Sequence, residues 1–195
     1  KAEKTADEIK NLISHADIDY CAAELGSIKE INTLVEEIGQ KHSHLDVLIN
    51  NAGVFAPVRK LSNDGFELNF AVNYLAAFLL SHLLEPLMNQ RSGSRIVNVS
   101  SVAHKRGRLD FEDLQSEREY ESYKAYADSK LMMIYLTYQQ AEQFAVNNIA
   151  VNALHPGVIT TKLLKQGFNM EGTDVTQGAE TLVYLAASPQ VERVT

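Results

Sequence analysis

Tyr126 and Lys130 form the pair of side chains in this sequence best suited to move a proton. They are four positions apart, so a helix would place both of them on one face. An ammonium group beside a phenol favours the phenolate and lowers a pKa that starts at about 10. Such a tyrosine can exchange a proton with an alcohol or carbonyl oxygen near neutral pH.

The same spacing occurs a second time, at Tyr120 and Lys124, and a chain with eight tyrosines is expected to contain such pairs by chance. Either pair is also consistent with a surface cation beside an exposed ring. We prefer Tyr126 and Lys130 because this pair opens a long predicted helix, whereas Tyr120 lies in a charged stretch.

Ser101 and Asn73 occupy positions from which they could serve the same reaction. Ser101 follows a predicted strand, where its hydroxyl could hydrogen-bond the substrate oxygen and stabilise its developing charge. The alternative is an ordinary turn serine at the end of a strand. Asn73 stands among apolar residues in a predicted helix, where asparagine is unfavourable without a partner. It is either part of a proton relay, holding a water or a carbonyl, or a satisfied core asparagine.

Short, continuously apolar segments alternate along the chain with longer segments of helical periodicity. This alternation is typical of an α/β protein with a parallel sheet covered on both faces. The predicted helices are 1–12, 28–42, 65–87, 125–147 and 173–187, and the predicted strands are 18–22, 46–50, 95–101 and 149–154. Such sheets bind ligands at the carboxyl ends of their strands, where segments 50–53, 100–101 and 155–157 lie.

Length and composition indicate one globular domain, with 195 residues of which 45% are apolar and 22% charged. The net charge of −7 argues against a general nucleic-acid or anionic-membrane surface. No uninterrupted apolar run reaches the roughly 18–20 residues of a membrane span. The single cysteine, Cys21, excludes an internal disulfide and is expected to be inert core, in a reducing compartment such as the cytoplasm. His42 and His44 lack further ligands, so no metal site is expected.

Taken together and in order, five motifs make the chain resemble the short-chain dehydrogenase/reductase superfamily. They are Asn50-Asn51-Ala52-Gly53, Asn73, Val97-Asn98-Val99-Ser100-Ser101, Tyr126-Ala127-Asp128-Ser129-Lys130 and Pro156-Gly157-Val158-Ile159-Thr160-Thr161. The long interval from Ser101 to Tyr126 resembles the retinol-dehydrogenase-like branch. The resemblance covers essentially the whole chain and implies a Rossmann-like, doubly wound parallel sheet.

The resemblance also implies a reversible hydride transfer between NAD or NADP and a carbonyl/alcohol pair. Tyr126 would be the acid/base, and Lys130 would lower its pKa and hold the nicotinamide ribose. Ser101 would orient the substrate oxygen, and Asn73 would complete the relay. The other residues expected to contact the cofactor are Glu24, Leu25, Asn50, Ala52, Gly53, Ile159 and Thr161. Glu24 stands where the family usually has an aspartate that faces the adenine.

The expected partner is a small-molecule substrate and not a nucleic acid. The apolar segment 161–172, with Leu163, Leu164, Phe168 and Met170, would suit a lipophilic carbonyl such as a retinoid, a steroid or a xenobiotic. The family also implies a homodimer through helices 65–87 and 125–147. Members of this branch often carry a membrane anchor upstream of the segment seen here.

The chain departs from the family pattern at both ends, and we expect it to be an internal segment of a longer protein. The family begins with a strand, a glycine-rich turn and a helix that cradle the pyrophosphate, and no such fingerprint occurs here. Without the first two strands, the predicted strand 18–22 has no proper neighbour, and strand 46–50 has an open edge. The last strand of the family is also expected to be missing.

Two other functions remain open at this point. In the first, loss of the phosphate cradle makes the chain a non-catalytic remnant that serves interaction or regulation. The intact Ser101, Tyr126 and Lys130 argue against this. In the second, the chain is a related epimerase or dehydratase, which also uses tyrosine and lysine. The short length after Gly157, with no large substrate lobe, argues against that alternative.

Overall fold

The computed structural model describes residues 2–168 and 171–195, and its centre is a three-stranded parallel sheet. The strands are β1 (Val47–Asn50), β2 (Arg95–Val99) and β3 (Ala150–Leu154), in the spatial order β1-β2-β3. β1 pairs with β2 and β2 pairs with β3, both in parallel. The three predicted strands 46–50, 95–101 and 149–154 are confirmed, each shortened at one end by one or two residues.

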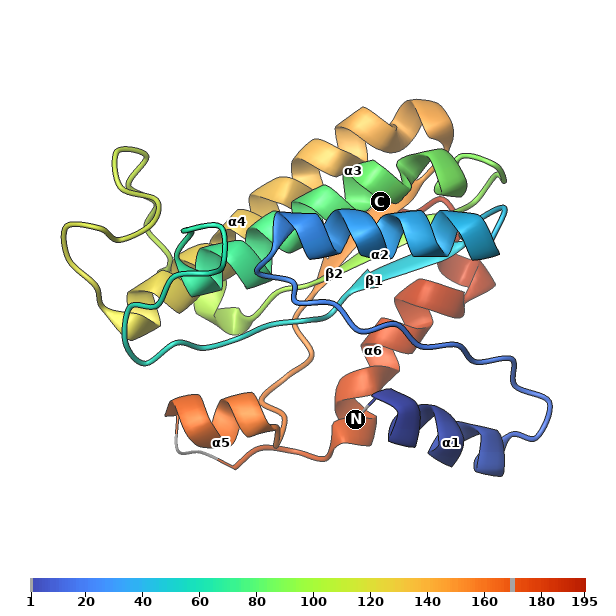
Figure 1. Ribbon diagram of the computed structural model, residues 1–195, viewed down its shortest axis with the longest axis horizontal. Coiled ribbons are helices and arrows are strands. Elements are labelled where there is room, and N and C mark those ends of the chain that lie inside the picture. Colours follow the sequence, from blue (N-terminus) through green and yellow to red (C-terminus); the bar gives the residue numbers. More distant parts are fainter. Residues whose placement is uncertain (1, 169–170) are drawn as a thin grey trace.

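Helices cover both faces of this sheet (Figure 1), as the α/β prediction requires. One layer contains α2 (Ile28–Lys41), α3 (Ala76–Met88) and α4 (Ser122–Phe144), and the other contains α1 (Ala2–Leu12) and α6 (Val175–Ala187). A short helix, α5 (Lys162–Phe168), follows β3. The chain also forms 3₁₀ turns at Val102–Arg106, Ala145–Asn147 and Pro189–Val191.

The central strand β2 is buried along its whole length, and its side chains alternate between two separate cores. Ile96 packs with Met88 of α3 and Phe144 of α4 on one face. Val97 and Val99 form a second cluster with Leu154, against the apolar side of α6. A strand that is buried on both faces has a continuously apolar sequence, so the sequence pattern was able to predict β2.

The helices begin at residues that satisfy their first free N–H groups. Ser27 accepts a hydrogen bond from Glu30 N–H at the start of α2, and Glu121 accepts bonds from Tyr123 and Lys124 N–H at the start of α4. Asp174 accepts a bond from Thr176 N–H and caps α6. Such caps set the helix starts independently of the tertiary fold.

The predicted strand 18–22 is wrong, because this segment has no regular secondary structure and pairs with no strand in the part of the chain that the structure describes. A strand needs a neighbour for its backbone N–H and C=O groups, and the described sheet offers none beside this segment. Asp19 instead accepts a hydrogen bond from Lys41 Nζ at 2.7 Å, which ties the segment to the end of α2. Cys21 therefore lies half-buried in irregular chain and not in a core strand.

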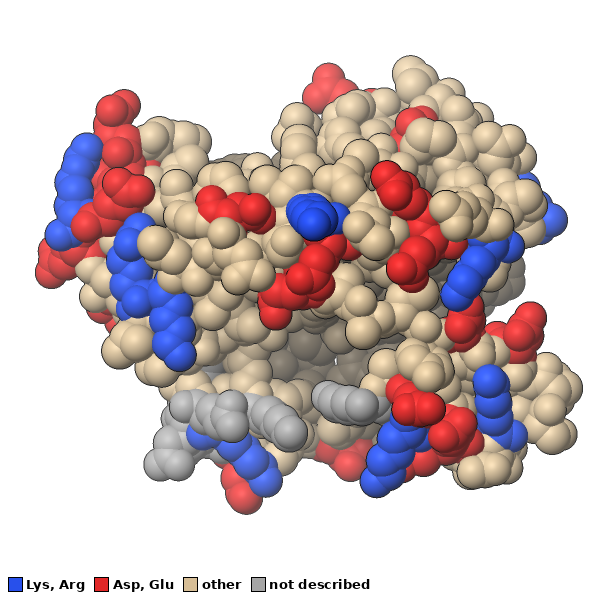
Figure 2. All heavy atoms as spheres, in the orientation of Figure 1, with Lys and Arg blue, Asp and Glu red and all other residues tan. Residues whose placement is uncertain are grey.

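β1 is an edge strand, as expected from the missing neighbour, and its Ile49 side chain is 39% exposed. Figure 2 shows a recess between the layer that contains α2 and the part of the chain that contains α1. On the face drawn, acidic and basic side chains are interspersed. An unpaired edge of this kind exposes backbone donors and acceptors.

The predicted helix 65–87 begins later than expected and is π-helical before it becomes α-helical. It opens with a π-helical turn at Phe70–Leu75 and continues as α3 to Met88, beyond Pro86. Phe70–Met88 is long and apolar enough to span a membrane by length and composition, although 39% of it is buried within the fold. This differs from the sequence-based expectation that no such segment exists. Its packing against α2 and α4 is that of a core helix.

Candidate active site

Asn73 lies in the middle of the π-helical turn and is 1% exposed. Its Oδ1 accepts a hydrogen bond from Val54 N–H at 2.7 Å, and its Nδ2 donates to Val54 O at 3.0 Å. The same Nδ2 donates to Ser129 Oγ of α4 at 2.9 Å. The asparagine is thus fully satisfied, and it joins the loop after β1 to the helix that carries Tyr126 and Lys130.

Lys130 is 4% exposed, and its Nζ donates a hydrogen bond to Val99 O at the carboxyl end of β2 over 3.0 Å. Burial of the ammonium lowers the pKa of Lys130 to about 8. Ser100 Oγ donates to Lys130 O at 2.8 Å and fixes this turn of the helix against the strand. A Cβ on Gly53 would lie 3.4 Å from both Lys130 Nζ and Asn73 Oδ1. The residues Gly53, Asn73 and Lys130 therefore meet at one place, although the family resemblance assigned Gly53 and Lys130 to different parts of the cofactor.

Tyr126 and Ser101 also meet, because the Tyr126 oxygen takes part in a side-chain hydrogen bond with Ser101. The Tyr126 ring packs edge-on against Phe55 with centroids 5.7 Å apart, and Lys130 Nζ lies over the ring at 5.9 Å from its centroid. The i, i+4 geometry thus places the cation beside the phenol, as the spacing predicts. Ser101 also caps the turn that follows β2, since its Oγ accepts from Ala103 N–H at 3.2 Å.

The pKa of Tyr126 differs in direction from the sequence-based expectation. Burial raises the pKa of the Tyr126 phenol above its usual value, and the hydrogen bond with Ser101 opposes this rise only in part. The phenolate is penalised because the ring is enclosed by the Ala103, Ala127 and Phe55 side chains. Burial likewise destabilises the charged ammonium of Lys130 relative to the neutral amine.

Tyr120, the alternative acid/base, is committed to a structural role. Its hydroxyl donates to Ala56 O at 2.7 Å and accepts from Asn69 Nδ2 at 3.1 Å. Burial, followed by the nearby Glu67 carboxylate, raises the pKa of Tyr120 to about 12. Lys124, its partner by spacing, donates instead to Asp128 Oδ2 at 2.6 Å. These contacts favour Tyr126 over Tyr120 as the proton-transfer residue.

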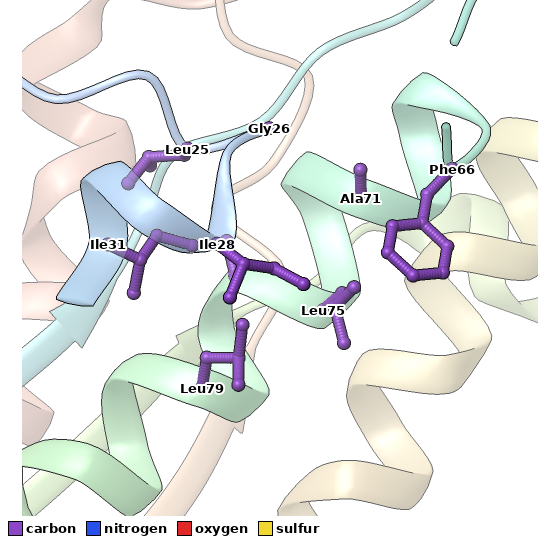
Figure 3. Close-up of a pocket in the computed structure, with 9 residues that line it drawn as sticks. Leu25, Gly26, Ile28, Ile31, Phe66, Ala71, Leu75 and Leu79 are labelled. Carbon is purple, nitrogen blue, oxygen red and sulfur yellow. The ribbon is translucent and has the colours of Figure 1, made fainter. Parts of the chain in front are cut away.

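Three of the predicted cofactor residues lie apart from this group. Asn50, the last residue of β1, is buried, and its Nδ2 donates to Asn98 Oδ1 at 2.8 Å and to Ser81 Oγ at 3.1 Å. Glu24 is exposed and accepts a hydrogen bond from Gly26 N–H at 3.1 Å. Leu25 lines a narrow apolar crevice between α2 and the helix 70–88 (Figure 3). The contact of these residues with a cofactor stays a prediction.

The segment after β3 reaches the site through α5. Leu163 packs against the cluster that contains Tyr126, and a Cβ on Gly167 would lie 2.9 Å from the Phe55 ring. Thr161 accepts a hydrogen bond from Leu164 N–H at the start of this helix. Ile159 is 9% exposed and packs against Gly178 of α6. Ala52 is exposed beside Gly53.

Met170, expected to line the substrate site, lies outside the described residues, and the Phe168 side chain is likewise not described.

Sequence reasoning missed two residues of this site. Phe55, two positions after Gly53, supplies the ring that packs on Tyr126, and no periodicity marks it because it lies in a loop. Ser129 accepts from Asn73 and donates to Tyr126 O at 2.7 Å. Its position between Tyr126 and Lys130 was a usable signal, because a buried serine in a helix needs partners.

This arrangement of a buried tyrosine and lysine beside a half-buried serine, at the carboxyl end of a parallel strand, agrees with what the chain matches. Residues 1–172 match the family described as short chain dehydrogenase, and the chain belongs to that family. It is 40% identical over 184 residues to the human protein named Retinol dehydrogenase 14, in a match covering 88% of this chain and 55% of that relative. The chain thus spans about half the length of this relative.

Solved structures show the same fold. A protein from Mycobacterium paratuberculosis is 28% identical, with a TM-score of 0.74, in a match covering 95% of this chain and 64% of the other. A structure from Beutenbergia cavernae, described as an NAD(P) dependent gluconate 5-dehydrogenase with bound NADP, is 27% identical with a TM-score of 0.65. That match covers 84% of this chain and 60% of the other.

Proposed function

We propose that the full-length protein is an oxidoreductase that transfers a hydride between NAD(P)(H) and a carbonyl/alcohol substrate. The observation that carries this proposal is the contact of Ser101 with Tyr126, with Lys130 Nζ held over the same ring. The family match and the relative named as a retinol dehydrogenase support it. NADP bound to the Beutenbergia cavernae protein supports a nicotinamide cofactor.

The residues present fit a nicotinamide cofactor. A Cβ at position 53 would lie against Asn73 and Lys130, and its absence in Gly53 leaves room beside the ammonium. Within the described residues, Lys130 Nζ uses one of its three N–H donors, on Val99 O. The remaining donors suit ribose hydroxyls, and the cofactor would supply or accept the hydride.

Tyr126 would move the proton that accompanies the hydride. In reduction, the carbonyl carbon receives the hydride and the Tyr126 hydroxyl donates its proton to the carbonyl oxygen, which yields the alcohol. Oxidation reverses both transfers. Ser101 would hold the same oxygen, and the raised pKa of Tyr126 keeps the phenol protonated at neutral pH, the form needed for reduction. Asn73 would serve by holding Val54 and Ser129 in place.

A lipophilic substrate would suit the apolar surroundings of Tyr126. Phe55 and Leu163 pack against the cluster that contains this tyrosine, and both belong to segments outside the sheet. The relative's printed name points in the same direction, since retinol is a lipophilic alcohol. Retinaldehyde is therefore the first substrate to test.

A homodimer through α4 also belongs to the proposal. Tyr135 and Tyr138 are 55% and 72% exposed and lie three positions apart on one face of this long helix. Exposed aromatic side chains on a helix commonly pack against a partner. Light scattering of the wild type and of Tyr138→Glu would test this, with loss of a dimer expected in the variant.

The function is tested by cofactor binding and turnover of the full-length protein. NADH and NADPH are titrated separately and followed by their own fluorescence, which a chain without tryptophan disturbs little. Retinaldehyde is then added, and loss of the reduced cofactor is expected. Saturable cofactor binding without turnover of any aldehyde or alcohol would instead support the non-catalytic alternative.

A further inference from the structure

An open concavity of about 470 Å³ lies between the 3₁₀ turn after Ser101 and the start of α4. Val102, Lys105, Arg106 and Tyr123 line it. A volume of this size is in the range of small-molecule sites, which measure about 300–1,000 Å³. The concavity thus combines two cationic side chains with an aliphatic and an aromatic one.

This concavity adjoins the candidate active site. Val102 directly follows Ser101, and Tyr123 precedes Tyr126 by one helical turn. Tyr123 also packs against the cluster that contains Tyr126. A molecule whose reacting carbon lies at Ser101 and Tyr126 could therefore extend past Tyr123 into the concavity.

The cations of the concavity are not neutralised by nearby carboxylates. Within the part of the chain that the structure describes, neither Lys105 nor Arg106 takes part in a salt bridge. Two carboxylates at the start of the adjoining helix already accept other hydrogen bonds. Glu121 accepts bonds from the N–H groups that begin α4, and Asp128 accepts from Lys124 Nζ and Arg108 N–H.

The charge of Lys105 also acts on the residue that follows β3. Partial burial, together with the nearby His104 and Lys105, lowers the pKa of His155, the residue that follows this strand. A cationic rim is notable on a chain of net charge −7, where the average field repels anions. Low-dielectric walls of a cleft strengthen the attraction of such a rim for an anion.

We propose that the concavity of Val102, Lys105, Arg106 and Tyr123 is a subsite for an anionic group, a carboxylate or phosphate, carried by an amphiphilic substrate. The apolar body of the molecule would pack on Val102 and Tyr123, and its charge would face Lys105 and Arg106. The inference rests on the proposed oxidoreductase function and deepens it, because it makes a lipophilic carbonyl compound with an anionic group a better ligand of the same site than an uncharged one such as retinaldehyde.

Two probes with the same ring system separate charge from apolar contact. 1-Anilinonaphthalene-8-sulfonate carries an anion, whereas N-phenyl-1-naphthylamine is its uncharged counterpart. Both are titrated by fluorescence against the full-length protein. We expect the sulfonate to bind more tightly than the amine, and to lose affinity as ionic strength rises.

Substitutions at the rim then assign the site. Lys105→Gln combined with Arg106→Gln is expected to weaken sulfonate binding roughly five- to tenfold and leave amine binding unchanged. The combination of Lys10→Gln and Lys29→Gln removes two exposed charges from α1 and α2 and is the control for net charge. Lys105→Arg keeps the charge and is expected to keep the sulfonate affinity.

Several results would overturn the proposal. One is an unchanged sulfonate affinity in the Lys105 and Arg106 double variant, and another is an equal loss for both probes. A third is binding of wild type, but not of the double variant, to phosphatidylserine-containing vesicles with no difference in sulfonate binding, which would assign the rim to a membrane surface. None of these measurements requires turnover, so failure of the proposed oxidoreductase activity would leave the titrations interpretable.

Discussion

The side-chain amide of Asn73 forms a two-point contact with the backbone of Val54, through hydrogen bonds of 2.7 Å and 3.0 Å. Among the described residues, the loop that leaves β1 has no strand beside Val54, and the amide makes the backbone hydrogen bonds that a neighbouring strand would otherwise make. Four residues earlier, Asn69 Oδ1 accepts from Ala56 N–H at 3.2 Å. Two asparagines of one helix thus hold alternate residues of the loop that carries Phe55 to Tyr126.

Asn73→Ala is expected to destabilise the protein by about 2–4 kcal/mol, because it removes three hydrogen bonds and leaves Val54 groups unsatisfied. The free energy of unfolding, from chemical denaturation, measures the effect. Asn32→Ala is the control, since this exposed asparagine donates one bond to Ile28 O and its loss should change stability by less than about 0.5 kcal/mol. Equal losses in the two variants would argue against the role of Asn73.

Gly107→Ala is expected to destabilise the protein by about 1–3 kcal/mol, because it introduces a side chain into a closed contact. The new Cβ would lie 2.8 Å from Leu131 Cβ and 2.9 Å from Ala127 O, and the backbone oxygen has little freedom to move. Gly39→Ala provides the opposite case on α2, where a Cβ meets no atom within 4 Å. Alanine there should raise stability by about 0.5–1 kcal/mol. Thermal unfolding compares the two variants, and a stabilising Gly107→Ala would contradict the packing.

Lys130→Met should change how stability depends on pH. Burial holds the pKa of Lys130 at about 8 in the folded state, against an ordinary value of 10.5. Between these values the unfolded chain binds more protons, so wild-type stability rises with pH in this window. The stability of the variant relative to wild type should therefore fall by about 2–3 kcal/mol from about pH 7 to about pH 10.

Lys29→Met, at an exposed position on α2, controls for the loss of one positive charge in that experiment. A relative stability of Lys130→Met that does not change with pH would show that the ammonium keeps its ordinary pKa. The buried position of Lys130 would then have to be solvated more than the structure indicates.

Tyr126→Phe in the full-length protein should abolish turnover and leave cofactor binding largely intact, because the hydroxyl alone carries the proton. Tyr120→Phe is the matched control. It removes the hydrogen bond to Ala56 O, and should cost about 1 kcal/mol of stability while preserving turnover. Steady-state rates and cofactor fluorescence separate the two outcomes. Near-normal turnover in Tyr126→Phe would contradict the assignment of Tyr126 as the acid/base, and Tyr120 would be tested next.

The rate of alcohol oxidation should rise from about pH 7 to about pH 10 without a plateau. Oxidation needs the Tyr126 phenolate, and burial raises the pKa of this residue, so the reactive form increases throughout the range. Carbonyl reduction should show no such rise, since it needs the phenol. The measurement is kcat/KM for both directions at each pH. A plateau in oxidation near neutral pH would instead favour the lowered pKa that the Tyr126–Lys130 spacing predicts.

Local patterns in the sequence predicted most of the elements that position this site. Helical periodicity located α2 and α4, and continuous apolar runs located β1, β2 and β3. These signals are local, because helix caps and apolar spacing act over a few residues. The i, i+4 spacing likewise placed Lys130 beside Tyr126 before any tertiary contact was known.

Other features depended on contacts between distant segments. The segment 18–22 has the composition of a strand but no neighbour to pair with, and the π-helical turn around Asn73 has no local signature. Spacing alone could not distinguish Tyr120 from Tyr126 as the acid/base. Ala56 and Asn69 hydrogen-bond the Tyr120 hydroxyl, whereas Ser101 contacts the Tyr126 hydroxyl, and these contacts join distant segments.

The sequence by itself therefore determined the chemical types at the site and the helices and strands that carry them. Only the tertiary structure decided which of these groups meet, how deeply they are buried, and in which direction their pKa values move. The reason is that desolvation and hydrogen bonding depend on every segment packed around a group. For Tyr126 those segments are the loop of Phe55, the turn of Ser101 and helix α5, which lie far apart along the chain.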